Sequence, residues 1–175
     1  FRQIFSSKKI ISLMDINFNN EIKETGSTLE QNALIKVRKV FNYSKKNCLS
    51  DDSGLEIDYL NGEPGVYSAR YAGNNANSID NIKKVLNNLG ETKNRKARFR
   101  TIIAYKDSST EKLFEGVING RISNIIIGKG GFGYDPIFIP ENYDITFSEM
   151  SLEQKNKISH RSLAIKKLFK FFCLK

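Results

Sequence analysis

The sequence is poor in the residues that build metal clusters, disulfide frameworks and nucleophilic triads. Its two cysteines, Cys48 and Cys173, show no metal-ligand spacing and are too few for a disulfide framework. Its single histidine, His160, has no Cys or Ser partner motif, so a nucleophilic triad has no support. The low cysteine content favours a reducing compartment, and we expect a cytoplasmic protein.

Long apolar runs and targeting patterns are also absent. No apolar stretch approaches the length of a membrane span, and no charged leader precedes an apolar core. We therefore expect a soluble protein with no membrane partner. No Gly-Lys-Ser/Thr closes a glycine-rich loop, which excludes a P-loop.

Positive charge, in contrast, is abundant. The chain has 175 residues, enough for one domain with a real core, and 28 Lys and Arg against 19 Asp and Glu leave a net charge of +9. This charge favours anionic partners without choosing among nucleotides, nucleic acids and lipid headgroups. The basic residues are scattered, and the aromatic-basic patterns of nucleic-acid binding are not evident, so we expect no nucleic-acid partner.

Apolar periodicity predicts a mixture of helices and strands. Helices are expected at about residues 29–43, 79–89 and 159–171, the second capped by Ser78, and capping boxes are expected at Thr28 with Gln31 and at Ser151 with Gln154. Strands are expected at about residues 48–50, 55–60, 97–105, 112–118, 122–127 and 137–139. This order of elements indicates a single α/β or α+β unit around one twisted sheet.

Two adjacent carboxylates, Asp51 and Asp52, follow the strand expected at residues 48–50. Ser53 and Gly54 are expected to form a sharp turn that exposes a carboxylate to a metal. Because neighbouring side chains on a strand point to opposite faces, only one of the two acids is predicted to bind the metal, and the other to be structural or to support the residues that bind it. An ordinary acidic turn is the alternative interpretation.

A glycine-rich aromatic loop spans residues 130–136. Glycines on both sides of Phe132 allow the backbone to approach a ligand while the ring offers a stacking surface. The alternative is a glycine-rich hairpin whose aromatic residue belongs to the core.

A cationic group lies at the start of the last expected helix. His160 and Arg161 follow Ser159, where a helix N-terminus favours anions and carbonyl oxygens, and Lys155 lies one turn earlier. Taken singly, His160 is better explained as a structural hydrogen-bonding residue, and Lys155 and Arg161 as solvated surface charges.

Four blocks of the sequence together resemble the inosine/xanthosine triphosphate pyrophosphatase family, in its order and spacing. They are ETGSTLEQNALIK (24–36), DDSGL (51–55) with PGVYSARY (64–71), GFGYDPIF (131–138) and KNKISHR (155–161). The resemblance implies an elongated, two-lobed α/β fold, with a central twisted mixed sheet flanked by helices, usually assembled as a homodimer. It also implies Mg²⁺-dependent hydrolysis of purine nucleoside triphosphates with non-standard bases (ITP, dITP, XTP) to the monophosphate and pyrophosphate.

The same resemblance implies the roles of individual residues. Asp52 matches the catalytic acid that binds the metal and activates water, and Glu24 matches a further metal ligand. Lys36 and Ser53 match contacts to the triphosphate. The matches to nucleotide and base contacts are Phe132, Gly133, Tyr134, Asp135, Lys155, His160 and Arg161.

The sequence departs from the family pattern in two places. Phe1 aligns just beyond the family's first strand and its Thr/Ser-x-Asn-x-x-Lys turn, and the first five residues resemble the middle of an amphipathic helix. We therefore expect residues 1–175 to be a single pyrophosphatase domain whose first strand and Asn-x-x-Lys turn are missing. Lys23 stands where relatives often have a second Glu.

Three alternatives remain open at this point. The first is a related pyrophosphatase that acts on other modified nucleotides. The second is a basic nucleic-acid-binding module, which predicts salt-sensitive binding to DNA or RNA. The third is an inactive remnant of the enzyme.

Overall fold

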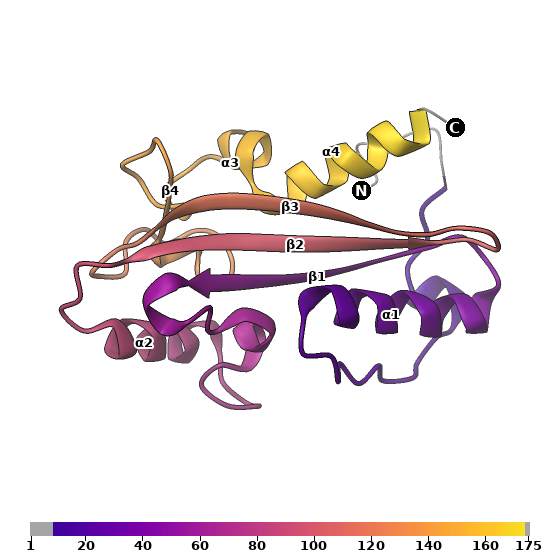
Figure 1. The fold of residues 1–175 in the computed structure, drawn as a ribbon, viewed down its shortest axis with the longest axis horizontal. Helices are drawn as coiled ribbons and strands as arrows, with labels where there is room; N and C mark the ends of the chain where they lie inside the picture. Colours follow the sequence, from indigo (N-terminus) through magenta and orange to yellow (C-terminus); the bar gives the residue numbers. More distant parts are fainter. Residues whose placement is uncertain (1–8, 174–175) are drawn as a thin grey trace.

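A four-stranded sheet forms the centre of the molecule, and its strands run along the long axis (Figure 1). The computed structural model describes residues 9–173. The strands β1 (Cys48–Ile57), β2 (Lys96–Lys106), β3 (Glu111–Ile122) and β4 (Phe138–Pro140) lie in the order β1-β2-β3-β4. Each is antiparallel to its neighbour, whereas the resemblance implied a mixed sheet.

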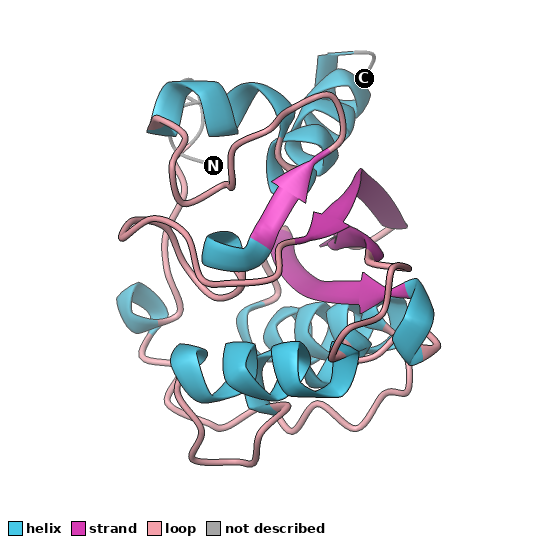
Figure 2. Ribbon diagram, turned by 90° about the vertical axis from the view of Figure 1, so that its left-hand side faces the viewer, coloured by secondary structure: helices cyan, strands magenta, loops and turns pink. Residues whose placement is uncertain are grey.

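Two layers of helices cover the sheet. Helix α1 (Leu29–Ser44) packs on one face, and α4 (His160–Cys173), preceded by α3 (Leu152–Ile158), packs on the other (Figures 1 and 2). Helix α2 (Ser78–Leu89) packs against Leu55 and Phe99, whose side chains alternate with those that face α1. No helix within residues 9–173 is long and apolar enough to cross a membrane. The helical pattern of the first five residues lies outside the described part of the chain.

The helix ends follow the capping residues closely. Thr28 accepts a hydrogen bond from the backbone of Gln31, and Ser151 forms a reciprocal capping box with Gln154. The cap of α2 is Asn77 rather than Ser78, which is the first helical residue. Asn77 accepts hydrogen bonds from two backbone N–H groups, so its amide supplies the acceptor that the serine was expected to provide.

Strand β2 divides the core between the two helix layers. Ile102 and Ala104 pack against α1, whereas Ile103 and Tyr105 pack against α4, as the alternation of side chains on a strand requires. All four side chains are buried. Full burial of each large apolar side chain contributes about 1.5–3 kcal/mol, so both layers are firmly attached to the sheet.

Strand β1 is longer than expected and contains no turn. It continues from Cys48 to Ile57 with unbroken pairing to β2, so the turn expected at Ser53 and Gly54 was wrong. A Cβ atom on Gly54 would lie 2.5 Å from the carbonyl oxygen of Gly65. Glycine at this position therefore permits the close approach of a neighbouring segment and does not reverse the chain.

The strand expected at residues 122–127 was also wrong. Strand β3 ends at Ile122, and Ser123 instead donates a side-chain hydrogen bond to the carbonyl of Ile125, 2.6 Å away. Ile125 and Ile126 are exposed. Within residues 9–173 their apolar run pairs with no strand, although the backbone N–H of Ile127 donates to the carbonyl of Pro136 at 2.9 Å. The β propensity of three consecutive isoleucines therefore does not by itself produce a strand.

Candidate active site

Strand β1 presents its two acidic side chains to opposite faces of the sheet. Asp52 faces α1, where the amide of Asn32 donates to Oδ2 at 3.4 Å. Asp51 faces α4, where Arg161 donates to its Oδ2 from Nη2 at 2.9 Å. The two carboxylates are therefore separated by the strand itself, as the alternation of neighbouring residues predicts.

Asp52 belongs to an acidic cluster arranged around one lysine. Lys36 Nζ donates to Asp52 Oδ1 at 2.6 Å and to Glu24 Oε1 at 2.7 Å. Asn32 is fully buried, and its Oδ1 accepts a hydrogen bond from the backbone of Gly26 at 2.8 Å. Asn32 thereby fastens the segment that carries Glu24 to the start of α1, next to Asp52.

Burial and the neighbouring charges set the protonation of this cluster. Burial raises the pKa of Asp52, and the ammonium of Lys36 only partly opposes that effect. For Lys36, burial acts to lower the pKa, but the hydrogen bonds and charges of Asp52 and Glu24 outweigh it, so the pKa is raised. Lys36 is therefore a fixed cation between two carboxylates at neutral pH.

The position of Lys36 tests whether these residues fit a divalent metal. Its ammonium lies between Glu24 and Asp52, where a cation bound by both carboxylates would lie. Within residues 9–173, no group of three or more His, Cys, Asp or Glu side chains is arranged to hold a metal. Mg²⁺ commonly uses one or two carboxylates and completes its shell with water and substrate phosphates. The pair Glu24 and Asp52 fits an ion held in that way.

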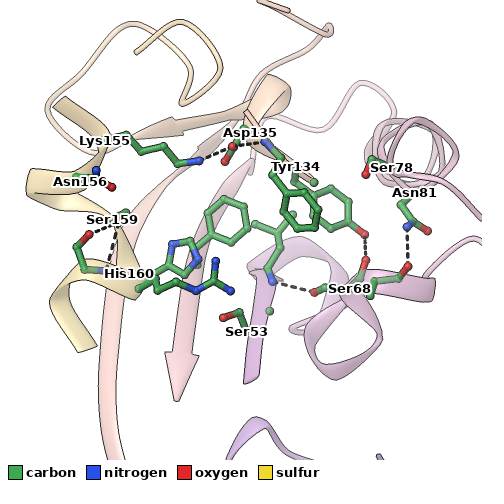
Figure 3. Close-up of a pocket in the computed structure, with 18 of the residues that line it drawn as sticks. Ser53, Ser68, Ser78, Asn81, Tyr134, Asp135, Lys155, Asn156, Ser159 and His160 are labelled. Atoms are coloured by element: carbon green, nitrogen blue, oxygen red, sulfur yellow. Dashed lines mark hydrogen bonds and ion pairs between the residues drawn. The ribbon is translucent and has the colours of Figure 1, made fainter. Parts of the chain in front are cut away.

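A cavity of about 880 Å³ lies beside the face of β1 that carries the side chains of Ser53 and Leu55 (Figure 3). It is lined by the start of α2 on one side and by the end of α3 and the start of α4 on the other. The predicted contact residues that line it are Ser53, Phe132, Gly133, Tyr134, Asp135, Lys155, His160 and Arg161. Glu24, Lys36 and Asp52 do not line this cavity, but Asp52 is the chain neighbour of Ser53.

The outer edge of β1 opens toward the cavity. Strand β1 is the first strand of the sheet, and Leu55 donates its outward-pointing backbone N–H to Ser68 Oγ at 2.9 Å. Because alternate residues of a strand direct their backbone N–H groups to the same edge, the N–H of Ser53 also points outward. Ser53 Oγ shares a hydrogen bond of 2.6 Å with Thr101 Oγ1. The backbone of Ser53 is thus available to an anion next to Asp52.

The glycine-rich loop folds around the carboxylate of Asp135. Asp135 is buried, accepts a hydrogen bond from the backbone of Phe132 at 2.6 Å and forms an ion pair with Lys155 (Figure 3). A Cβ atom on Gly131, whose φ is +86°, would lie only 2.4 Å from Asp135 Oδ2, so glycine is required there. Asp135 therefore fixes the shape of the loop, and its ion pair with Lys155 holds the carboxylate in place.

The two aromatic residues of this loop have different environments. Tyr134 is buried, and its hydroxyl donates to the carbonyl of Ser68 at 2.8 Å (Figure 3). Phe132 is 82% exposed at the mouth of the cavity. The core-aromatic alternative thus describes Tyr134, whereas the ring of Phe132 is free to stack on a flat ligand.

His160 is a neutral side chain in the wall of the cavity. Its ring stacks on Phe99, with centroids 4.7 Å apart and planes at 15°. Burial, together with the charges of Arg161 and Lys155, lowers its pKa to about 3. Its Nδ1 is buried and has no hydrogen-bond partner within residues 9–173. Since an orphaned buried N–H is rarer than an orphaned acceptor, we assign the proton to Nε2, which makes that atom a donor.

Sequence reasoning assigned no role to several residues that build this cavity. Ser68 binds both β1 and the hydroxyl of Tyr134, and buried Asn81 donates to the carbonyl of Ala69 at 3.1 Å. Phe99 supports the ring of His160. Ser68 and Ala69 lie within the block PGVYSARY, which carried the resemblance without indicating which of its side chains matter.

Comparison with known proteins agrees with this arrangement. The model of the Ham1 family matches residues 1–171. A protein of Flavobacterium psychrophilum named dITP/XTP pyrophosphatase is 47% identical over 166 residues, which cover 95% of this chain and 87% of that protein. A protein of Staphylococcus aureus with the same name is 44% identical over 166 residues, covering 94% and 85% of the two chains.

Solved structures give the same result for the fold. The Staphylococcus aureus Ham1 protein superimposes with a TM-score of 0.94 at 43% identity, covering 98% of this chain and 90% of its own. A HAM1 protein from Coxiella burnetii also gives a TM-score of 0.94, at 36% identity, covering 99% and 91% of the two chains. Because its motifs, its fold and nearly its whole length match, this chain belongs to the Ham1 family.

Proposed function

We propose that this protein hydrolyses non-standard purine nucleoside triphosphates (ITP, dITP and XTP) to the monophosphate and pyrophosphate, and so removes them from the nucleotide pool. The observation that carries the proposal is the placement of two chemically different groups on adjacent residues of β1. Asp52 joins the acidic cluster, and Ser53 joins the cavity that contains Phe132 and His160. A nucleotide whose base occupies the cavity can extend its phosphates past Ser53 to Asp52.

The phosphate end of the substrate requires positive charge and an activated water. We assign Glu24 and Asp52 as ligands of Mg²⁺, which neutralises phosphate oxygens and lowers the pKa of bound water when it is present. Lys36, which neutralises both carboxylates here, is then placed to contact the phosphates. The backbone N–H of Ser53 supplies a further donor at the edge of β1.

The reaction itself needs a base for the attacking water. In our proposal Asp52 takes the water proton as the water oxygen bonds to the α-phosphorus, and the bond from that phosphorus to the pyrophosphate oxygen breaks. The raised pKa of Asp52 suits a residue that must accept a proton near neutral pH. The products are the nucleoside monophosphate and pyrophosphate.

The base end of the substrate lies among stacking surfaces and fixed donors. Phe132 stacks on the purine, and His160 Nε2–H and the guanidinium of Arg161 donate to the 6-keto oxygen of hypoxanthine or xanthine. The 6-amino group of adenine is itself a donor and leaves both protein donors unpaired. Sites that depend on such hydrogen bonds can discriminate by roughly 10⁴-fold or more.

The assembly and location of the enzyme are part of the same proposal. We propose a homodimer in the cytoplasm, in agreement with the low cysteine content and the resemblance to the family. Light scattering coupled to size-exclusion chromatography measures the mass of the particle, and a value near the 19.9 kDa of one chain contradicts the dimer.

The decisive test of function is the Asp52→Asn variant. This change keeps the size of the side chain and an oxygen that can accept the hydrogen bond from Asn32, but it removes the negative charge and the base. We therefore expect Mg²⁺-dependent pyrophosphate release from ITP to fall at least roughly 10³-fold. Circular dichroism and the melting temperature verify folding. Retained turnover contradicts the role of Asp52.

A substrate panel distinguishes the alternatives. We expect ITP, dITP and XTP to be hydrolysed far faster than ATP, GTP or modified pyrimidine triphosphates, with pyrophosphate as the co-product. Preference for a modified pyrimidine indicates the related pyrophosphatase, and the absence of hydrolysis by the wild-type protein indicates an inactive remnant. Release of single phosphates contradicts cleavage at the α-phosphorus.

A further inference from the structure

We infer that Asp51 is a positioning residue for base selection, because it holds the guanidinium of Arg161 in the wall of the nucleotide cavity. This inference rests on the proposed function and extends it to a residue outside the predicted site. Arg161 Nε and Nη2 donate to the same oxygen, Asp51 Oδ2, at 3.2 and 2.9 Å. The pair joins the start of α4 to the middle of β1, 110 residues apart in the chain.

The location of Arg161 requires such a partner. It is the second residue of α4, where the helix dipole presents partial positive charge to another cation. Lys155 lies nearby and also lines the cavity. Arg161 thus occupies an electrostatically unfavourable position, and Asp51 is the carboxylate that compensates for it.

The geometry of the ion pair leaves part of Arg161 for a ligand. A guanidinium has five N–H groups, and the pair with Asp51 uses Nε–H and one N–H of Nη2. Both N–H groups of Nη1 lie outside this pair, while the residue lines the cavity. Asp51 therefore orients the guanidinium without consuming it.

Preorganisation explains why this orientation affects selectivity. The side chain of Arg161 is 52% exposed, and an arginine that is not held loses rotamer entropy when it orders on a substrate. A guanidinium already fixed by Asp51 can donate to the 6-keto oxygen without this loss of entropy. Loss of Asp51 weakens this hydrogen bond and also makes the cavity more positive, which attracts every triphosphate alike. The ratio of kcat/KM for ITP to that for ATP reports the weakened hydrogen bond to the base, because the added positive charge affects both substrates equally.

The test uses the full chain carrying Asp51→Asn. We expect the ratio of kcat/KM for ITP to that for ATP to fall roughly tenfold, mainly through a higher KM for ITP, and Asp51→Glu to restore most of it. In an Arg161→Ala background, adding Asp51→Asn should change the ratio by less than about twofold, because Asp51 acts through Arg161. The Mg²⁺ concentration for half-maximal activity should stay unchanged, since Asp52 faces the other side of β1.

Glu111→Gln is the matched control. It breaks an ion pair with Arg38 of similar exposure, 54% for the arginine and 26% for the acid, against 52% and 32% at Arg161 and Asp51. Neither control residue lines the cavity, so the substrate ratio should not change. If Asp51→Asn fails to fold, Asp51→Ser, which also removes the carboxylate, is expected to lower the ratio similarly.

The results separate the inference from the proposed function. A wild-type enzyme that prefers ITP, combined with an unchanged or increased ratio in Asp51→Asn, overturns the inference alone. An increased ratio means that Asp51 withholds Arg161 from the base. An equal fall with and without Arg161 also overturns it. A wild-type enzyme without preference for ITP overturns both.

Discussion

The side chains of Asp52 and His160 show how residues of one site acquire different protonation states. Both are largely enclosed, and burial disfavours the charged form of each. For an acid this raises the pKa, and for an imidazole it lowers the pKa. Near neutral pH His160 is an uncharged donor, while Asp52 is a carboxylate with enhanced affinity for a proton. One physical cause therefore supports two roles.

The pH dependence of activity tests the state of Asp52. Its pKa is raised, so the active carboxylate is lost as pH falls through a value above the ordinary one of about 3.9 for aspartate. We expect the acid limb of kcat/KM for ITP to lie above that value and to move to lower pH as Mg²⁺ is increased, because metal and proton compete for the carboxylate. His160 contributes no limb between pH 5 and pH 8, since its pKa is about 3.

The Lys36→Met variant provides a comparison for the dependence of kcat/KM on pH. Removing the ammonium removes the charge that opposes protonation of Asp52, so the acid limb should move to higher pH at low Mg²⁺. A limb that neither Mg²⁺ nor this substitution displaces contradicts the assignment to Asp52.

At the level of elements, the site depends on how closely α4 approaches the sheet. Gly116 of β3 lies directly beneath the first turn of α4, and a Cβ atom there would lie 1.9 Å from the carbonyl oxygen of His160. Gly54 of β1 permits a similar approach by Gly65. These glycines set the distances between elements that carry His160, Arg161 and Ser68.

The Gly116→Ala substitution tests this contact. The added methyl group must push α4 away from β3, which we expect to cost about 2 kcal/mol or more and to lower the melting temperature by roughly 5 °C. Because His160 moves with the helix, kcat/KM for ITP should fall at least roughly tenfold. Asn119→Ala, at an exposed position of the same strand, is the control and should change neither quantity appreciably. Unchanged stability and activity in Gly116→Ala would show that the contact is unimportant.

Considered as a whole molecule, the protein is a cation that acts on a polyanion. Its net charge of +9 attracts a triphosphate, and added salt screens this attraction over about 8–10 Å at physiological ionic strength. The charge has little to do with the fold, because the sheet and its two helix layers are held by apolar packing. It acts instead on encounter with the substrate.

The salt dependence of the kinetics measures this effect. Between 50 and 400 mM KCl we expect kcat/KM for ITP to fall roughly threefold or more, while kcat changes less than about twofold. Binding of uncharged inosine, measured by calorimetry, is the control and should be insensitive to salt. An equal loss of kcat would indicate that salt perturbs the enzyme itself.

The family and helices α1, α2 and α4 could be predicted from the sequence because they depend on local patterns. Capping residues such as Thr28 and Ser151 determine helix starts through their own hydrogen bonds, and four motifs in a fixed order identified the family, which is confirmed. The opposite directions of Asp51 and Asp52 also follow from strand geometry alone. The roles assigned to individual site residues remain predictions.

Other features depended on contacts between distant segments. Glycine at position 54 is compatible with a turn or with close packing. The structure shows close packing, because the carbonyl of Gly65 occupies the space that a Cβ atom would need. The isoleucines after Ser123 have strong strand propensity, but within residues 9–173 they pair with no neighbouring strand. The sequence by itself determined which residue types are available and how each segment tends to fold. The tertiary structure alone decided that Asp51 meets Arg161 and that Lys36 lies between Glu24 and Asp52, because those partners are brought together by packing of the helix layers on the sheet.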